Sequence, residues 1–205
     1  MNKTTLVFTL MILISSCGIM NKSKALTETQ NTLRTDFTKY LDLIINKEFR
    51  KSMDYMVPEF FEILPKEDLI EEMEQTMNNP DIDIELKEPK ILEIGKITKV
   101  ANRFYSKLKY SSMINMKFKG EDEETKENEK MRIDFMQFSL EATFGSENVT
   151  YNVETDFFKV YSEQDIIAIS DNGKSAWKFL VVDEKDEVQM LFLEQLVPEE
   201  VLNLK

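Results

Sequence analysis

The chain has 205 residues, with 26 Lys and Arg against 38 Asp and Glu, no His and a single Cys. The resulting net charge of −12 argues against a nucleic-acid partner, because phosphate recognition needs a basic surface. The lack of His excludes Ser-His-Asp and Cys-His catalysis and His-ligated zinc, and one Cys excludes an intrachain disulfide. We therefore expect no cofactor and no metal centre, and a protein that is not an enzyme.

The N-terminus has the order of a secretory signal: Lys3, an apolar stretch from Leu6 to Ile14, and then small residues. The stretch is too short to span a membrane, which takes about 20 residues. The sequence Ile14-Ser15-Ser16-Cys17 resembles the lipobox of bacterial lipoproteins. This resemblance implies cleavage before Cys17 and attachment of a diacylglycerol to its sulfur, and Cys17 is the only Cys in the chain. The alternative is an ordinary cleaved signal with an incidental Cys.

The lipoprotein resemblance also bears on location. Gly18 is not the Asp that is linked to inner-membrane retention, and the basic, polar segment Asn21 to Lys24 replaces the acidic run of some surface lipoproteins. We expect an outer-membrane lipid anchor that faces the periplasm, with a Gram-positive surface anchor as the alternative. Residues 1–16 then form the signal peptide, 17–27 the lipidated N-terminus and tether, and 28–205 a single domain. The mature chain has 25 basic and 38 acidic residues, and a charge of −13 suits a body beside the membrane rather than on it.

Apolar spacing predicts helices in the first third of the domain. Leu33, Phe37 and Leu41 continue with Ile44 along one helical face. A second helical segment from Phe49 to Leu64 contains Pro58, which should interrupt it. Pro65 suits the first turn of a third helix, and Asn78-Asn79-Pro80 ends it.

After Asp81 the apolar period becomes two, which predicts antiparallel strands. The long run from Val100 to Phe118 indicates one long strand or a bent pair, and Gly120 to Glu129 an exposed hairpin loop. Between Met131 and Phe144 the apolar positions change from odd to even, which predicts a strand with a β-bulge. The remaining predicted elements are strands at 149–157, 166–169 and 175–182, a hairpin turn at 171–173, a helix at 186–196 and a last helical turn after Pro198.

This order of elements indicates an α+β fold in which N-terminal helices pack on a strongly bent antiparallel β-sheet, with a short C-terminal helix. It resembles the NTF2-like and cystatin-like superfamily, and in particular its small bacterial lipoproteins. The resemblance rests on the helix pair from Phe37 to Leu64, the bulged strand near Phe135-Met136, and Ser175-Ala176-Trp177-Lys178-Phe179. It implies a cone-shaped sheet, although no strand is evident between the second and third helices.

Two groups of residues are candidate binding surfaces. A bent sheet under helices often leaves an apolar cup, and the residues expected to line it are Phe104, Phe135, Phe157, Trp177 and Phe179. The alternative is that these residues fill the core. A basic stripe on the opposite side of the long strand suits an anionic partner, or is the solvated face of the sheet; it consists of Arg103, Lys107, Lys109, Lys117 and Lys119.

The function we expect is a non-enzymatic interaction module of the cell envelope, held to the membrane through Cys17 and binding an envelope protein or a small hydrophobic ligand. The alternative is a carrier that encloses such a ligand in the cup. A third possibility is a hydrolase or isomerase built on a carboxylate and a Tyr, which needs a raised carboxyl pKa. Its candidate residues are Asp134, Glu154, Asp156, Tyr105, Tyr110 and Tyr151.

Overall fold

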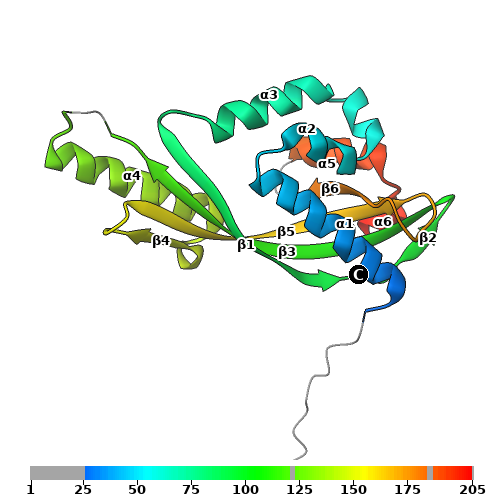
Figure 1. The fold of residues 1–205 in the computed structure, drawn as a ribbon. Coiled ribbons are helices and arrows are strands. Elements are labelled where there is room, and N and C mark those ends of the chain that lie inside the picture. The colour runs from blue at the N-terminus through cyan, green and yellow to red at the C-terminus, as the bar shows by residue number, and fades with distance from the viewer. Residues whose placement is uncertain (1–25, 121–122, 184–186, 205) are drawn as a thin grey trace, which may run out of the picture.

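An antiparallel β-sheet with helices on both faces forms the described part of the chain (Figure 1). The structure is a computed structural model, and it describes residues 26–120, 123–183 and 187–204. The predicted α+β class is confirmed, with six α-helices and six strands in these residues. The predicted signal peptide and lipid site at Cys17 lie outside the described residues.

Two long strands form the centre of the sheet. β3 (Arg103–Phe118) and β5 (Phe157–Ser170) pair without interruption from Phe104 opposite Ser170 to Met116 opposite Phe158. β1 (Ile82–Ile94) and β2 (Thr98–Val100) pair with the other edge of β3. β4 (Val149–Asn152) and β6 (Lys178–Val182) pair with opposite ends of β5. At about 3.3 Å per residue, the 16 residues of β3 extend over about 50 Å. We call the end near Arg103 basal and the end near Phe118 distal.

Helix α1 (Glu28–Ile45) covers the basal half of one sheet face. Thr27 and Gln30 form a capping box at its start, which satisfies backbone N–H groups that have no partner within the helix. The predicted helical face is confirmed, because its apolar residues are buried against even-numbered residues of β3 and β5. This cluster contains Leu33, Phe37, Leu41, Leu108, Ile166, Ala168, Trp177 and Phe179.

The interruption predicted at Pro58 is confirmed. The segment divides into α2 (Phe49–Ser52), η1 (Met53–Tyr55) and, beginning at Pro58, η2 (Pro58–Glu62). α3 (Lys66–Met77) follows as predicted. Its apolar face packs on α2 and η1 in a small cluster of Phe49, Met53 and Ile70 with Met73 and Met77 at its margin. The methionines fill the irregular spaces between these short helices.

The C-terminal helices cover the opposite face of the sheet. α5 (Glu187–Leu196) and α6 (Glu199–Leu202) confirm the helix and the last helical turn expected there. Their buried residues contact odd-numbered residues of β3 and β5, because successive side chains of a strand point to opposite faces. The cluster contains Val57, Tyr105, Ile167, Ile169, Leu180, Leu193, Val197 and Val201.

The predicted strand from Met131 to Phe144 is wrong: residues Lys126–Phe144 form the 19-residue helix α4. The hairpin loop predicted from Gly120 to Glu129 is also wrong, because the strand β3 is followed by a helix and not by a second strand. Thr125 is the N-cap and accepts a hydrogen bond from the backbone N–H of Asn128 at 3.2 Å. The change from odd to even apolar positions, which we interpreted as a bulge, reflects apolar residues on two faces of one helix.

Three strand boundaries were also wrong, and the strand predicted at 175–182 begins only at Lys178. Residues 149–157 are not one strand but β4, a turn and the first residue of β5. The short strand predicted at 166–169 is the basal end of the 14-residue β5. Asp156 begins the return at a positive φ of 62°, a conformation that turns the chain sharply.

Candidate interaction surfaces

The structure brings together only part of the predicted apolar cup. Trp177 and Phe179 are buried beneath α1, and Phe104 lies at the margin of the same cluster. Phe37 of α1 occupies the space above them, with its ring centroid 4.9 Å from that of Phe179. Phe135 lies on α4 and is 61% exposed. Phe157, the fifth predicted residue, starts β5 at the distal end. The predicted residues therefore do not line one cup, and α1 fills the basal part.

The predicted basic stripe is neutralised by neighbouring groups of the chain itself. All five of its residues lie on β3 or immediately after it, as expected. Each also has a partner: Arg103 with Glu59 (2.6 Å) and Asp171 (3.0 Å), Lys107 with the carbonyl oxygen of Leu202 (2.8 Å), Lys109 with Asp165 (3.7 Å), Lys117 with Asp156 (3.3 Å), and Lys119 with Asp83 (2.8 Å). Four of the five residues are thus in surface ion pairs, and Lys107 donates to a carbonyl oxygen.

An open groove of about 780 Å³ lies at the basal end, beside the start of α1. We call it the basal groove. Three lysines line it, Lys96, Lys99 and Lys174, together with the carboxylate of Glu93. None of these lysines has an ion-pair partner among the described residues, whereas four of the five residues of the basic stripe do. The groove is therefore a cationic region on an acidic protein.

Hydrogen bonds from α1 hold the walls of the basal groove together. Gln30 donates from Nε2 to the carbonyl oxygens of Ile94 and Gly95 at 3.1 and 3.0 Å. The hydroxyl of Thr32 donates to the carbonyl oxygen of Lys174 at 2.7 Å. Gly173 has a positive φ of 67°, and a Cβ there would lie 2.6 Å from the ring of Phe104. The sequence did not indicate the groove, because its walls are far apart along the chain.

Helix α4 has a second apolar face that points to solvent. Its inner face packs Leu140 on Val149, Phe158 and Val160 of the sheet. Its outer face presents Met131, Phe135 and Phe138, which are 65%, 61% and 71% exposed, followed by the exposed Ala142. We call these four residues the α4 stripe. Their spacing of four, three and four residues places them on one line along the helix.

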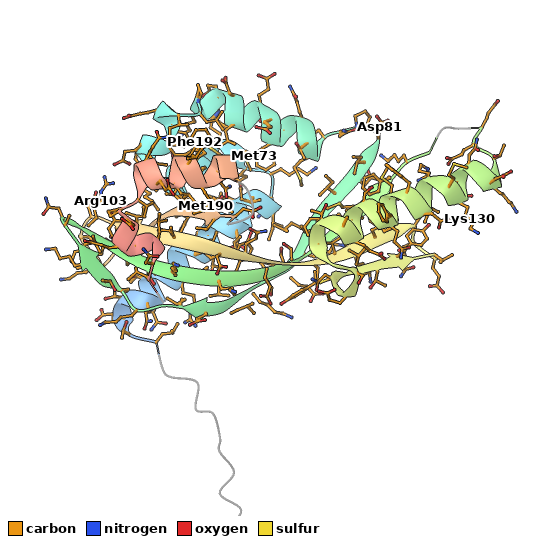
Figure 2. The ribbon with its side chains drawn as sticks, turned by 180° about the vertical axis from the view of Figure 1, so that it is seen from behind. Met73, Asp81, Arg103, Lys130, Met190 and Phe192 are labelled. Carbon is orange, nitrogen blue, oxygen red and sulfur yellow. The ribbon has the colours of Figure 1, made fainter. Side chains whose placement is uncertain are left out.

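Arg132 fixes the position of α4 at the distal end. Its guanidinium donates to the carbonyl oxygen of Phe118 at 2.6 Å and to the carboxylate of Glu124 at 3.0 to 3.2 Å. The hydrogen bonds to Glu124 raise the pKa of Arg132. Figure 2 shows α4, with Lys130 labelled, at the opposite end of the molecule from Arg103. The α4 stripe and the basal groove thus lie at opposite ends of the sheet.

One of the predicted Tyr–carboxylate combinations does form. The hydroxyl of Tyr151 donates to Oδ1 of Asp156 at 2.5 Å, and Lys117 lies 3.3 Å from the other carboxylate oxygen. Burial acts to raise the pKa of Asp156, but the hydrogen bonds from Tyr151 and Lys117 outweigh it and the pKa is lowered. A general acid needs the opposite shift. This pair therefore stabilises the β4–β5 turn, which begins at Asn152 and ends at Phe157.

The Tyr151–Asp156 hydrogen bond gives a testable pH dependence. Burial and the bond to Asp156 raise the pKa of Tyr151 to about 12. Because an unfolded Tyr titrates near pH 10, this bond stabilises the fold fully below pH 10, and its contribution is lost between pH 10 and about 12. We expect the stability difference between wild type and Tyr151→Phe, measured by urea unfolding, to shrink over that interval. The tyrosinate absorbance that the variant lacks should have its midpoint near pH 12; a midpoint near 10 would contradict this assignment.

The described residues contain no group of three or more Cys, Asp or Glu side chains arranged to hold a metal ion. No helix in the described ranges combines the length and apolar character needed to cross a membrane.

A scan against models of known protein families finds no match. No curated protein matches the chain significantly either.

Proposed function

We propose that this protein is a lipid-anchored, non-enzymatic interaction module of the bacterial cell envelope, tethered through Cys17 to the outer membrane and facing the periplasm. The finer assignment to an NTF2-like or cystatin-like cone belongs to the same proposal, and helices packed on a bent antiparallel sheet support it. The observation that carries the proposed function is the α4 stripe, because large apolar side chains that remain exposed in a line mark an interaction surface.

The surroundings of the α4 stripe favour a protein over a lipid as its partner. Beside the stripe, Glu127, Asp134 and Glu141 outnumber Lys130 on α4, so an anionic membrane surface would repel this side of the helix. The start of α1 bonds to Ile94, opposite Leu108 of β3, whereas Arg132 of α4 bonds to Phe118, about 33 Å further along the strand. An anchor at the basal end leaves the distal end free to meet an apolar helix face on another protein.

The docking role can be tested by placing a photoreactive amino acid at position 138 of the protein in its own membranes. We expect a discrete protein–protein adduct, identified by mass spectrometry. The matched control has the same group at position 153, because Val153 is 82% exposed but lies outside α4. Equal yields at the two positions, or adducts only with lipid, would contradict a docking surface on α4.

The anchor is tested separately by the mass of the mature protein extracted from its membranes. A chain that begins at Cys17 and has a diacylglycerol and a third acyl chain supports the proposal. An unmodified Cys17 would remove the anchor while leaving the α4 stripe and its test intact. Purified protein that turns over a common ester, phosphate or glycoside, and loses that activity on one Asp or Glu substitution, would contradict the non-enzymatic role.

The basal groove gives a further prediction about the anchored end. Replacing Lys96, Lys99 and Lys174 with Gln should weaken association of the unlipidated mature chain with phosphatidylglycerol vesicles at low salt by at least about tenfold, because each Lys near an anionic surface contributes about fivefold. The control replaces Lys39, Lys126 and Lys159, which removes the same charge from exposed positions elsewhere. Co-sedimentation measures the association of each variant with the vesicles. An equal loss of association in the two variants would show that it depends only on the net charge of the protein.

A further inference from the structure

We infer that the basal groove binds the head group of one anionic phospholipid of the anchoring membrane, with the phosphate at its three lysines and the first acyl carbons on its apolar residues. This inference rests on the lipid anchor of the proposed function, but not on the α4 stripe. A phospholipid combines a negatively charged phosphate with apolar chains, so its site needs cationic and apolar groups side by side. The walls of the basal groove meet that requirement.

Three lysines from three separate segments line the basal groove. Lys96 lies in the loop between β1 and β2, Lys99 on β2, and Lys174 in the turn between β5 and β6. Glu93 on the wall and Glu28 next to it reduce this positive charge but do not cancel it. The other described lysines with neither an ion-pair partner nor a carbonyl acceptor are spread over three elements: Lys39 of α1, Lys126 and Lys130 of α4, and Lys159 of β5. The groove is therefore the place in the described structure where lysines without such partners gather.

Apolar side chains lie in the same groove. Ile94, Ile97 and Phe104 line it, and all three are partly buried at the margin of the core under α1. Lys99 is directly opposite Phe104 in the pairing of β2 with β3, so the two side chains are on the same face of the sheet. The ammonium of Lys99 lies 5.5 Å from the centroid of the Phe104 ring. A positive charge is thus held next to an apolar surface, as a phosphate with attached apolar chains requires.

Hydrogen bonds fix the two loops that carry Lys96 and Lys174. The side chain of Asn172 accepts at Oδ1 from the backbone N–H of Lys174 at 2.7 Å. Directly before Lys96, the N–H of Gly95 donates to the carbonyl oxygen of Lys107 at 2.7 Å. Because these loops are already ordered, binding does not have to pay the entropy of ordering them. The volume of about 780 Å³ is also within the range of small-molecule sites.

The proposed anchor brings the basal groove to the membrane. Leu26 and Thr27 line the groove, and Cys17 is nine residues before Leu26. Nine residues span at most about 32 Å, so a lipidated chain keeps the groove within that distance of the head groups. Phospholipids are then at a high effective concentration, and a site of weak intrinsic affinity is occupied. The acidic residues beside the α4 stripe are about 33 Å further along the sheet, far beyond the screening length of about 8 Å, and do not oppose this contact.

A head group in the basal groove would orient the domain on the membrane. The lipid at Cys17 prevents the chain from leaving the surface, but a flexible tether leaves the domain free to rotate. A second contact at the basal end removes that freedom and directs the distal end away from the membrane. The α4 stripe would then be presented to other proteins rather than to lipid.

The decisive experiment places a photoreactive aliphatic amino acid at position 97 of the lipidated chain. The chain is inserted into vesicles with equal amounts of phosphatidylcholine and phosphatidylglycerol, and the lipid adducts are measured by mass spectrometry. We expect phosphatidylglycerol adducts to exceed phosphatidylcholine adducts at least about fivefold, because the positive groove favours an anionic over a zwitterionic head group. The matched control has the same amino acid at position 92. Leu92 is also apolar and 47% exposed near the end of β1, but it does not line the groove, so no enrichment is expected there.

Two substitutions in the groove should change this ratio of adducts in opposite directions. Lys99→Gln should lower it about fivefold, because it removes one of the three positive charges. Glu93→Gln should raise it by a similar factor, because it removes the carboxylate on the groove wall. Lys39→Gln is the control for net charge, since Lys39 is exposed on α1 and does not line the groove, and it should leave the ratio unchanged. Unfolding curves for each variant verify that the substitutions at these surface positions leave the fold intact.

The outcomes separate this inference from the proposed function. Chains that do not float with the vesicles would contradict the anchor, and with it a lipid of the anchoring membrane as the ligand. Chains that float but show no enrichment at position 97, or equal enrichment at positions 97 and 92, would overturn the head-group site and leave the anchor intact. Loss of the phosphatidylglycerol adduct with millimolar glycerol phosphate, but not with chloride at the same ionic strength, would overturn the lipid in favour of a soluble phosphate ester.

Discussion

Replacing Phe37 with Ala is expected to lower the free energy of unfolding by about 3–5 kcal/mol. Phe37 is 0% exposed and contacts Tyr110 and Phe179 edge to face, with ring centroids 5.2 and 4.9 Å away. Its removal leaves a cavity between α1 and the sheet that close-packed neighbours cannot fill. Because a domain is stable by only about 5–15 kcal/mol, the loss is a large fraction of the total.

Urea unfolding followed by the fluorescence of Trp177, the only Trp, measures this effect in the same cluster. Phe138→Ala is the matched control, because it removes the same side chain from a position that is 71% exposed. We expect it to change the unfolding free energy by no more than about 0.5 kcal/mol. A comparable loss in both variants would contradict the packing of α1, the orientation of α4, or both.

The second large effect is expected on the docking of α4 to another protein. Replacing Phe135 and Phe138 with Ser should reduce the protein–protein adduct from a photoreactive group at position 142 to background. Aromatic residues at the centre of an interface each contribute about 2 kcal/mol or more, or at least about 30-fold in affinity. The double variant removes both aromatic side chains of the α4 stripe, while the inner face of α4 and its contact with the sheet are unchanged.

The matched control replaces Val153 and Leu191 with Ser. These residues are also large, apolar and exposed, at 82% and 59%, but they lie on the β4–β5 turn and on α5. We expect an unchanged yield of the adduct in this control. An adduct that persists in the Phe135 and Phe138 variant would exclude the α4 stripe as the docking surface.

Helix α4 shows why one element was predicted in the wrong class. In a helix with one buried face, apolar residues recur with a period of 3.6, as they do at Leu33, Phe37 and Leu41. In α4 a second apolar line, Met131 to Ala142, is added to the inner one, and together they obscure that period. Local signals for a helix were nevertheless present: Thr125 as a cap and good helix formers directly after it. The residues that obscured the helix are those we propose as the interface.

The candidate binding surfaces depended even more on tertiary structure. The alternation along β3 correctly predicted that the basic residues share one face, but not that α5 and α6 cover the basal part of that face. The neutralisation of the basic stripe depends on Asp165 and Asp83, which strand pairing brings from β5 and β1. Phe135 was expected to line the same cup as Trp177, but it faces solvent on α4. Strand register and the orientation of α4 decide which aromatic side chains are in contact. Neither can be predicted from the positions of the aromatic residues in the sequence.

The sequence by itself determined the α+β class, α1 and α3, the interruption at Pro58 and the alternating strands, because each follows from periodicity or from the backbone limits of a few adjacent residues. Only the tertiary structure decided that α1 fills the predicted cup, that the loops at residues 95–99 and 172–174 meet in a basal groove, and that α4 exposes its stripe at the distal end. These outcomes depend on contacts between segments far apart along the chain, and the packing that orders those segments arises only once the sheet has formed.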